Sequence, residues 1–576
     1  MFDLHPCIKR YTRDLDKAVP PEETVSRIQS LVTQNRQLLE STRRVDTGRL
    51  GIPVYMSICG PRAREVMPTR KQMGKGASAA QAEASALMEF IERYSLFSFL
   101  TRKKTEGALL TWSQAQRTFQ HSLIPIKDLL LSVHEERPEQ EAVQILDCVP
   151  WSFCAAFDLH TADSSILPLD WFQTLNEFNG SSAGNTEVES VLQGLCELIE
   201  RHVCARIDVQ QPVLPSIDPD SIADPILQEL LTAFVQNNIS VWLKDFSLEY
   251  GVPTVGALAY DPATFPKSSE IVFTAGTATS PEKAAMRALT EVAQLAGDFE
   301  TESRYEASGL SKFTRIEQCE WLWQGNTVSL SALPDISDPD MQIELSRLLH
   351  VLAGHGHSAY AVRTTDPGLQ IPAHYSIVPG FDFRERSSHQ SLGLFVGRIL
   401  AEQQPEDVAR HGLQVLEHFY PQAHFLPFFQ GILAMRTGRY DQARAAFAKA
   451  EPLQPTDQDT AFAVFYQAYC LSQEEKWGRA TPLLDRAVDL APDVHAFYNL
   501  RGVSHFKGRR YEQAIQDFHF ALNIDPGSAM DLVNLGLSYK RVGKHQQAII
   551  HLQAGLELDP GLDRARAELE DLLTSN

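Results

Sequence analysis

A long repeat near the C-terminus constrains the fold of this chain more than any other feature of its sequence. Four alanines recur at spacings of 37, 34 and 34 residues, and four prolines recur at the same spacings. A glycine or alanine also lies twelve residues before each of these alanines. The alanines are Ala443, Ala480, Ala514 and Ala548, the prolines are Pro455, Pro492, Pro526 and Pro560, and the earlier small residues are Gly431, Ala468, Gly502 and Gly536. Small residues let paired helices approach closely and proline ends the second helix, so the pattern predicts four stacked helical hairpins.

This pattern resembles the tetratricopeptide repeat (TPR), and the resemblance covers residues 424–560. The first spacing is longer because three residues are inserted between the first two repeats. Residues 561–576 are expected to form a polar capping helix, since the last unit of a solenoid must face solvent. Residues 391–423 are expected to form a helical linker. The C-terminal part of the chain is therefore predicted to be an all-α TPR solenoid.

In tetratricopeptide arrays the first helix of each pair lines a concave groove, and this resemblance identifies the groove residues. They are Phe425, Phe428, Ile432 and Met435 in the first repeat, Phe462, Phe465, Tyr469 and Ser472 in the second, and Ala496, Asn499, Val503 and Phe506 in the third. The groove of the first two repeats is thus aromatic and apolar, which predicts docking of a protein or peptide substrate. The alternative is that this face packs against the N-terminal domain of the same chain.

Length and composition limit what else the chain can do. At 576 residues it is too long for a single hydrophobic core, so at least two domains are expected. Its net charge of −21 argues against a basic face for nucleic acids or anionic membranes. It has no apolar run long enough to span a bilayer, no apolar signal region, and no CxxC pair among its eight cysteines. A cytoplasmic protein without nucleic-acid or membrane partners is therefore expected.

A second repeat lies in the N-terminal part of the chain. The pattern Gly-x12-Glu-x-Ile-Glu-Arg begins at Gly76 and again at Gly184, 108 residues later. In each copy a glycine-containing turn precedes a helix that opens with a capping box. A third helix, opening at Ser280-Pro281 after the strand-like segment EIVFTAG, resembles the first two loosely. Residues 1–390 are therefore predicted to form one α+β domain.

Each of these three helices carries a polar stripe at helical spacing. The stripes hold glutamate, asparagine, glutamine and arginine but almost no lysine, unlike an ordinary solvated face. They comprise Ser85, Glu89, Glu92 and Arg93 in the first helix, Asn185, Glu189, Gln193, Glu197, Glu200 and Arg201 in the second, and Arg287, Glu291 and Gln294 in the third. The plain alternative is that these are the exposed faces of amphipathic helices.

Clustered carboxylates repel one another unless cations neutralise them, and glutamate and asparagine oxygens are typical ligands of Mg²⁺. Arginines offer paired donors to phosphate oxygens. Such a set suits a nucleoside triphosphate held by metal ions. The chain has no GxxxxGK[ST] loop and no protein-kinase signature, and Gly74-Lys75-Gly76 is too short to count as one. An ATP site would therefore have to be built from carboxylates.

Four segments resemble the signature sequences of the YcaO family. They are GKGASAAQAEASALMEFIERYS (74–95), FNGSSAGNTEVESVLQGLCELIERH (178–202), MRALTEVAQ (286–294) and SIVPGFDF (376–383). The resemblance covers about residues 1–390 and implies an α+β domain that binds ATP and Mg²⁺. Members of this family phosphorylate a backbone amide oxygen, after which azolines, thioamides or amidines form. One group with C-terminal helical repeats is associated with thiomethylation of a ribosomal protein.

The resemblance also implies roles for individual residues. Those that match the magnesium-binding glutamates are Glu89, Glu92, Glu189, Glu197 and Glu200. Those that match nucleotide-binding positions are Lys17, Thr24, Asn185, Arg201, Arg287 and Glu291. Ser85 is expected to pack at a helix crossing rather than to take part in chemistry.

One departure from the family pattern concerns the C-terminus, because azoline-forming members end in a PxPxP tail and this sequence ends in DLLTSN. Cyclodehydration of a peptide precursor is therefore not the favoured reaction. The substrate is expected to dock through the repeats or to be presented by a separate partner protein. The rival interpretation is a TPR scaffold whose YcaO domain only senses ATP or is vestigial. The target peptide, the incoming nucleophile and the oligomeric state, a homodimer included, stay open.

Overall fold

The computed structural model describes residues 5–34, 37–46, 48–106, 109–296, 299, 310–383, 390–525, 527–559 and 561–574. The chain divides into two compact units. The first comprises residues 1–139 and 150–390, and the second comprises residues 140–149 and 391–576. The short segment 140–149 thus groups with the helical unit, although the sequence pattern alone places it in the N-terminal domain.

The first unit begins with a small antiparallel sheet in the order β1-β2-β3. Its strands are β1 (Leu39–Arg44), β2 (Val54–Cys59) and β3 (Lys71–Lys75). Two helices, α1 (Pro21–Gln34) and the long α3 (Ala79–Glu106), pack against each other, and α3 also covers β2 and β3. Phe90 and Ile91 of α3 are fully buried beneath this sheet with Ile28 of α1, so the apolar side of α3 faces the core.

A second sheet has the strand order β11-β10-β9-β8-β12. Its strands are β8 (Ser216–Ile217), β9 (Ser240–Asp245), β10 (Thr254–Tyr260), β11 (Val272–Thr277) and β12 (Thr327–Val328). Strand β10 lies between β11 and β9 and is antiparallel to both, and its residues 254–259 are all buried. A strand buried on both faces reads as a continuous apolar run, as the segment TVGALA does.

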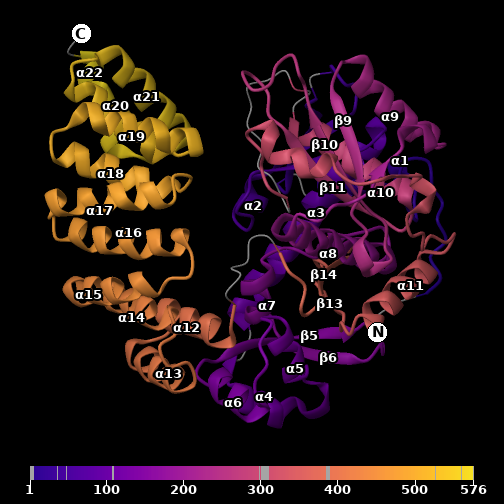
Figure 1. The fold of residues 1–576 in the computed structure, drawn as a ribbon, viewed down its shortest axis with the longest axis horizontal. Coiled ribbons are helices and arrows are strands. Elements are labelled where there is room, and N and C mark those ends of the chain that lie inside the picture. The colour runs from indigo at the N-terminus through magenta and orange to yellow at the C-terminus, as the bar shows by residue number, and fades with distance from the viewer. Residues whose placement is uncertain are drawn as a thin grey trace. The chain divides into compact units, whose positions relative to one another are not determined.

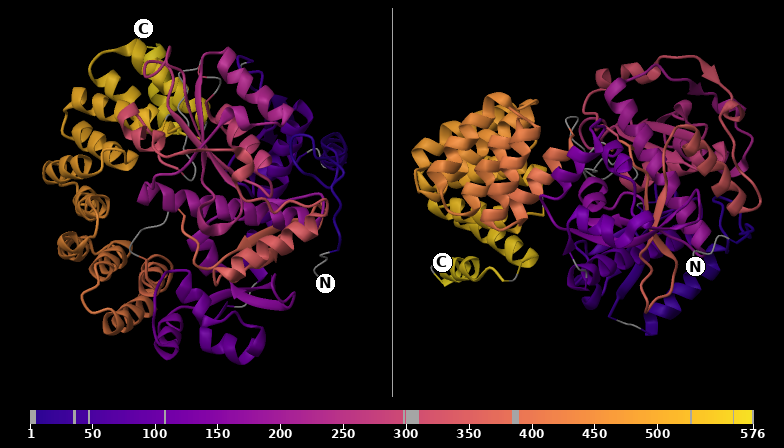
Figure 2. Two further views of the ribbon diagram at one scale, coloured as in Figure 1. Left: turned by 45° about the vertical axis from the view of Figure 1, so that its right-hand side comes forward. Right: turned by 90° about the horizontal axis from the view of Figure 1, so that it is seen from below.

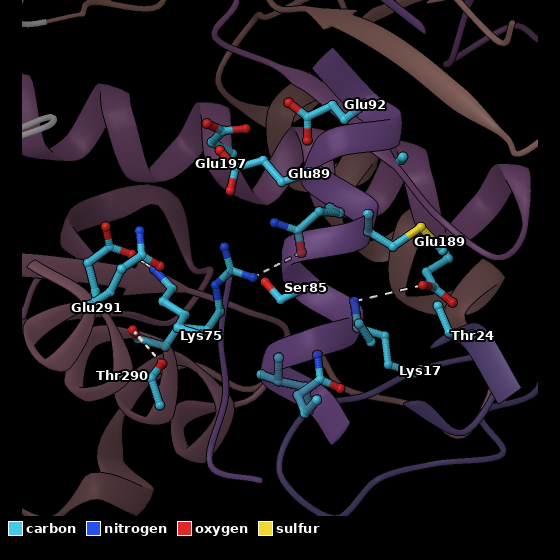
Figure 3. Close-up of a pocket in the computed structure, with 18 of the residues that line it drawn as sticks. Lys17, Thr24, Lys75, Ser85, Glu89, Glu92, Glu189, Glu197, Thr290 and Glu291 are labelled. Carbon is cyan, nitrogen blue, oxygen red and sulfur yellow. Dashed lines mark hydrogen bonds and ion pairs between the residues drawn. The ribbon is translucent and has the colours of Figure 1, made fainter. Parts of the chain in front are cut away.

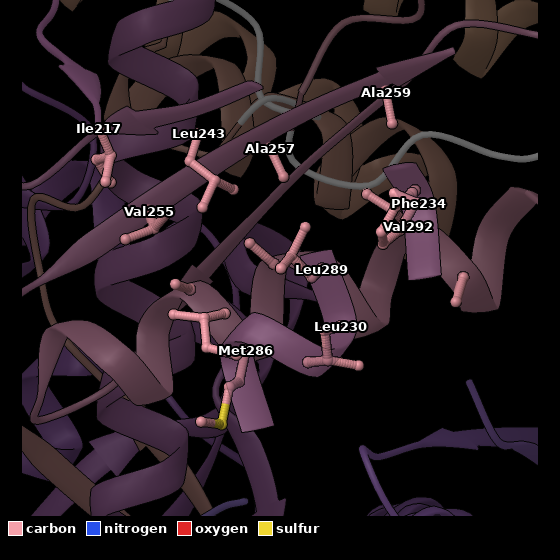
Figure 4. Close-up of a cluster of buried hydrophobic side chains, with 14 of the residues drawn as sticks. Ile217, Leu230, Phe234, Leu243, Val255, Ala257, Ala259, Met286, Leu289 and Val292 are labelled. Carbon is pink, nitrogen blue, oxygen red and sulfur yellow. The ribbon is translucent and has the colours of Figure 1, made fainter. Parts of the chain in front are cut away.

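One face of this second sheet packs on the helices α9 (Pro225–Gln236) and α10 (Pro281–Ala296). Figure 4 shows Leu243, Val255 and Ala257 of the strands pointing toward Leu289 of α10 and Phe234 of α9. These side chains are at most 5% exposed, and burying each large aliphatic one contributes about 1.5–3 kcal/mol. This core fixes α10 against the sheet and thereby sets the position of its polar stripe.

A third sheet follows the order β4-β5-β13-β14-β7, with β6 paired to β5. Its strands are β4 (Leu109–Leu110), β5 (Trp151–Asp158), β6 (Ser164–Pro168), β7 (Ser181–Ala183), β13 (Tyr360–Arg363) and β14 (Ala373–Ile377). The helix α8 (Glu187–Gln210) contacts β7 and β14 of this sheet and β11 of the second sheet. Helix α8 therefore joins the two sheets.

The other helices of the N-terminal part are α2 (Pro61–Arg64), α4 (Trp112–Phe119), α5 (Ile126–Leu131), α6 (Glu139–Leu146), α7 (Leu169–Asn176) and α11 (Met341–Gly354).

The second unit is a stack of helical hairpins (Figures 1 and 2). Two helices, α12 (Leu392–Gln403) and α13 (Glu406–Phe419), precede the repeats. The four pairs are α14 (Phe425–Arg436) with α15 (Tyr440–Ala450), α16 (Asp457–Gln473) with α17 (Trp477–Leu490), α18 (His495–Lys507) with α19 (Tyr511–Ile524), and α20 (Ala529–Arg541) with α21 (His545–Leu558). A last helix, α22 (Asp563–Thr574), packs on α21. The predicted α+β domain followed by an all-α repeat region is confirmed.

The small residues of the repeat act where the helices of a pair cross. A Cβ atom on Gly431 would lie 2.7 Å from the Phe447 ring, and one on Gly502 would lie 2.7 Å from the Phe518 ring. The recurrent alanines are fully buried. Close approach thus depends on a small residue on the first helix facing a large one on the second. Pro455 and Pro492 follow the second helices of their repeats, whereas Pro526 and Pro560 lie outside the described residues.

Part of the predicted groove is internal to the repeat stack. The rings of Phe462 and Phe465 lie 5.2 and 5.0 Å from the ring of Phe497 in the next repeat. Phe465 is only 9% exposed. These two aromatic residues therefore hold consecutive repeats together.

Among the described residues, no helix has the length and apolar character needed to cross a bilayer.

Candidate active site

The polar stripes of three helices meet at one cavity of about 380 Å³ in the first unit. The stripes belong to α3, α8 and α10, and the chain between residues 15 and 24 closes the remaining side. Every predicted site residue lines this cavity: Lys17, Thr24, Glu89, Glu92, Asn185, Glu189, Glu197, Glu200, Arg201, Arg287 and Glu291. Figure 3 shows three groups around it, with Glu89, Glu92 and Glu197 together, Lys75 with Glu291, and Lys17 with Thr24 and Glu189.

Each of the three helices follows a strand, and a glycine at or next to the end of that strand lies against the helix. A Cβ atom on Gly74 would lie 2.0 Å from the backbone nitrogen of Ala86 in α3. One on Gly184 would lie 2.5 Å from the backbone nitrogen of Ser190 in α8, and one on Gly276 would lie 2.4 Å from the carbonyl oxygen of Ala284 in α10. Side chains at these positions would push the strand ends away from the helices. The glycines therefore set the helix positions and hence the shape of the cavity.

Ser85 is half-buried and lies on the cavity side of α3. The crossing of β3 and α3 is made by Gly74 with Ala82 and Ala86, which lie on the neighbouring helix face. Ser85 instead lines the cavity beside Glu89. The helical spacing of the sequence predicts Ser85 on the polar stripe of α3, and Ser85 lies there in the structure.

The N-terminal side of the cavity is held by hydrogen bonds to the start of α8. Thr24 Oγ1 donates to Asn185 Oδ1 at 3.1 Å, and Asn185 Nδ2 donates to Glu189 Oε1 at 3.2 Å. The backbone nitrogen of Ala18 donates to Glu189 Oε2 at 3.0 Å, and Lys17 Nζ lies 3.7 Å from Glu189 Oε1. Glu189 is only 2% exposed, so these contacts fix its carboxylate. The residues 17–24 are thereby positioned over the cavity.

Three carboxylates from α3 and α8 lie together in a desolvated position. Burial raises the pKa of Glu92 to about 8, with the neighbouring Glu197 and Glu89 raising it further and Arg93 opposing. Burial likewise raises the pKa of Glu89 and of Glu197. Glu92 also accepts a hydrogen bond from Ser181 Oγ at 2.6 Å. Buried and mutually repelling carboxylates are stabilised by a cation placed between them.

Cations from α8 and α10 also line the cavity. Arg201 Nη2 lies 3.8 Å from Glu197 Oε1, and Arg287 Nη1 donates to Gln193 Oε1 at 2.9 Å. The buried Nε of Arg287 makes no hydrogen bond to any described residue. Glu200 accepts a hydrogen bond from the backbone nitrogen of Thr277 at 2.9 Å, which ties α8 to the end of β11. An unsatisfied guanidinium nitrogen in a cavity is suited to an anionic ligand.

The donor set fits Mg²⁺ together with a nucleotide. Within the described residues, no three acidic, histidine or cysteine side chains lie close enough to hold a metal ion by themselves. Mg²⁺ sites usually combine one or two carboxylates with water and substrate phosphates, so a complete protein cage is not required. In such a site the carboxylates with raised pKa would be the metal ligands, and the cations would contact phosphate.

The sequence interpretation missed some cavity residues. Lys75, Gln81 and Phe178 line the cavity, and the Arg93 guanidinium stacks over the Phe178 ring at 4.4 Å. Gln81 lies in the first turn of α3, where its backbone nitrogen donates to Ser78 Oγ at 3.3 Å. Its buried Oε1 accepts no hydrogen bond from any described residue, so only half of the predicted capping box forms. Lys75 lies in the GKG segment, which matches no phosphate-loop motif. Its place in the site follows only from the pairing of β3 with β2 and the approach of α10.

Comparison with known proteins agrees with this geometry. Residues 73–382, more than half of the chain, match the family described as YcaO cyclodehydratase, ATP- and Mg²⁺-binding. Residues 467–529 and 532–561 match tetratricopeptide repeat families. A solved heterocyclase in complex with substrate and cofactor has the same fold, with a TM-score of 0.53 and 19% identity over 66% of this chain and 54% of that one.

Two curated relatives extend the match. An uncharacterised protein of Methanothermobacter thermautotrophicus is 29% identical over 349 residues, which is 58% of this chain and 87% of that protein. The ribosomal protein S12 methylthiotransferase accessory factor YcaO of Escherichia coli is 27% identical over 208 residues, only 33% of this chain and 35% of that protein. The family match over more than half of the chain leads to one conclusion. The chain belongs to the YcaO family, whose domain binds ATP and Mg²⁺, and it carries tetratricopeptide repeats after that domain.

Proposed function

We propose that this protein uses ATP to phosphorylate the oxygen of a peptide backbone amide, which prepares that amide for modification. The observation that carries the proposal is the convergence of all eleven site residues, from three helices and the N-terminal segment, on a single cavity. The same residue types are expected for an ATP- and Mg²⁺-binding domain of the cyclodehydratase class.

In this proposal, Glu89, Glu92 and Glu197 bind Mg²⁺, since their raised pKa values favour a nearby cation. Arg201 and Arg287 bind phosphate oxygens through their guanidinium groups. Bound ATP supplies the phosphoryl group, and Mg²⁺ neutralises its charge. Glu200 and Glu189 are further ligands, which Thr277 and Asn185 hold in place.

Residues 17–24 cover the nucleotide at the side of the cavity that Lys17 and Thr24 line. Lys17 and Thr24 bind the nucleotide directly, and Asn185 links Thr24 to the carboxylate of Glu189. Closing the site in this way excludes water, which limits wasteful hydrolysis of ATP and strengthens electrostatic contacts within the cavity.

The incoming group distinguishes the reactions that follow activation. The methylthiotransferase accessory factor among the relatives and the heterocyclase among the solved structures point to sulfur chemistry and ring closure as the two classes to test. We propose the former, thioamidation or an accessory role in ribosomal protein methylthiolation, with the protein or peptide substrate bound through the repeats or by a partner protein.

Mass spectrometry of the cellular proteome with and without this chain tests the proposal. Ring closure changes a peptide mass by about −18 Da, thioamidation by about +16 Da and methylthiolation by about +46 Da. Complementation with the wild-type chain should restore the modification and complementation with Glu197→Gln should not. If no protein changes mass, or if Glu197→Gln restores the modification fully, amide activation at this site is wrong.

A further inference from the structure

Lys75 is held at the edge of the cavity by its two glycine neighbours. It is the last residue of β3, and its backbone pairs with Val54 of β2. A Cβ on Gly74 would lie 2.0 Å from the nitrogen of Ala86, and one on Gly76 would lie 2.7 Å from the nitrogen of Ala82. Both glycines therefore press the strand against α3, and the Lys75 side chain between them enters the cavity.

Charged side chains of both signs surround Lys75 in the cavity. Its ammonium group forms an ion pair with Glu291 of α10, and both side chains are about one-fifth exposed, 22% and 18%. Arg287 and Arg201 are close enough to disfavour its charge, while Glu200 and Glu89 favour it. Burial, reinforced by Arg287 and Arg201, lowers the pKa of Lys75 to about 7.

Three cations thus converge beside the carboxylates of the site. Positive charges repel one another, and the carboxylates of Glu291, Glu200 and Glu89 offset part of that repulsion. An anion of high charge density bound among Lys75, Arg201 and Arg287 relieves the rest. The carboxylates next to them, Glu89 and Glu200, are the proposed magnesium ligands, and Mg²⁺ usually accompanies the terminal phosphates of a nucleotide.

We propose that Lys75 binds the β- and γ-phosphates of the nucleotide and that Glu291 holds its side chain in place before the nucleotide arrives. This inference rests on the nucleotide site proposed above and adds a residue to it. The alternative role for Lys75 is purely structural, as one half of an ion pair that joins β3 to α10.

Calorimetric titration of the full-length chain with Mg²⁺ and either AMPPCP or AMP separates these roles. Lys75→Met should weaken AMPPCP binding by about tenfold or more, because one charged contact to phosphate is lost. AMP lacks the β- and γ-phosphates, so its affinity should change less than about twofold. Lys75→Arg keeps the charge and should recover part of the AMPPCP affinity. Lys71→Met is the matched control, because Lys71 is exposed on the same strand and should leave both affinities unchanged.

The outcomes distinguish this inference from the proposed function. If the wild-type chain binds no AMPPCP with Mg²⁺, the nucleotide site itself is wrong. If the wild-type chain binds AMPPCP and Lys75→Met binds it equally well, only the role of Lys75 is wrong. Equal losses of AMPPCP and AMP affinity in Lys75→Met would show a structural role.

A second measurement uses the wild-type chain alone and does not depend on how the variants fold. Reductive methylation of lysines, followed by peptide mass spectrometry, reports the accessibility of each ammonium group. Saturating AMPPCP with Mg²⁺ should slow the labelling of Lys75 at least about fivefold, as a contact to phosphate withdraws the amine from solvent. AMP should have little effect, and the labelling of Lys71 should not respond to either nucleotide. Unchanged labelling of Lys75 at saturating AMPPCP overturns the inference.

Discussion

The hydroxyl of Thr24 donates a hydrogen bond to the side-chain oxygen of Asn185 at 3.1 Å, which joins the N-terminal segment to the residue before the N-cap of α8. The two residues lie 161 positions apart in the sequence. Thr24 is only 3% exposed, and Asn185 in turn donates to Glu189. The nucleotide-covering segment and a proposed metal ligand thus belong to one hydrogen-bonded chain.

Replacing Thr24 with valine should weaken binding of AMPPCP with Mg²⁺ by about fivefold, because a hydrogen bond of roughly 1 kcal/mol is lost at similar volume. Titration calorimetry measures the effect. Thr24→Ser keeps the hydroxyl and should bind like the wild-type chain. Equal affinity in Thr24→Val and the wild type would mean that this contact does not position the nucleotide site.

Removing magnesium should remove the stabilising effect of the nucleotide. The carboxylates Glu89, Glu92 and Glu197 repel the phosphates unless a dication lies between them. AMPPCP should therefore raise the melting temperature of the chain when Mg²⁺ is present and leave it nearly unchanged in excess EDTA, since only a ligand bound to the folded state stabilises it. The same upward shift with and without EDTA would contradict a metal-dependent site.

The glycines that precede the site helices should not tolerate a methyl group. In Gly276→Ala the new Cβ would lie 2.4 Å from the carbonyl oxygen of Ala284, so β11 and α10 must separate. The free energy of unfolding should fall by about 1–3 kcal/mol, and nucleotide affinity should fall with it. Gly354→Ala is the control, because nothing lies within 4 Å of its Cβ position. Urea denaturation and calorimetry give the two readouts, and a fully stable Gly276→Ala would refute the close-approach argument.

A buried histidine should make the first unit sensitive to mild acid. Burial lowers the pKa of His374 to about 3, and its side chain contacts Ser190 Oγ at 3.0 Å. The unfolded chain has a histidine pKa of about 6.5, so it takes up a proton that the folded chain does not. The contribution of His374 to the free energy of unfolding is therefore complete above about pH 6.5. The free energy of unfolding then falls by up to about 1.4 kcal/mol per pH unit as the pH decreases toward 3.

The test is urea denaturation at pH 7 and pH 5, followed by tryptophan fluorescence. Six of the seven tryptophans lie in residues 1–390, so the signal reports mainly on that unit. His374→Gln should reduce the loss of stability between the two pH values. His121→Gln, at an exposed position, should not alter it. A pH dependence of His374→Gln identical to that of the wild-type chain would exclude His374 as a source.

Phe465 should act as a structural residue of the repeats. It is 9% exposed and its ring lies 5.0 Å from that of Phe497. Phe465→Ala should destabilise the helical unit by about 3–5 kcal/mol through the cavity it leaves. Phe520→Ala, at a position that is 53% exposed, should cost far less. Circular dichroism during urea denaturation compares them, and similar small losses in both variants would restore Phe465 as a candidate docking residue.

The repeats and the polar stripes were predictable because both depend on local periodicity. The Ala443 series specifies a helix crossing within one hairpin, and the two Glu-x-x-Glu-Arg units each lie within one helix. The sequence could not place Lys75, because its partner Glu291 comes from α10 and its orientation depends on how β3 pairs with β2. The burial of Phe465 was missed for a related reason, since it arises from contacts between repeats and the groove positions were counted within one repeat.

The most direct test of the account is titration of Mg²⁺ and AMPPCP into the wild-type chain and into Glu197→Gln. Glu197 is the carboxylate that α8 contributes to the group with Glu89 and Glu92, and its replacement keeps the side-chain size while removing the charge. We predict saturable binding by the wild-type chain, with an affinity at least about tenfold higher than that of Glu197→Gln. Absence of binding by the wild-type chain, or equal binding by both proteins, would contradict a carboxylate-built nucleotide site.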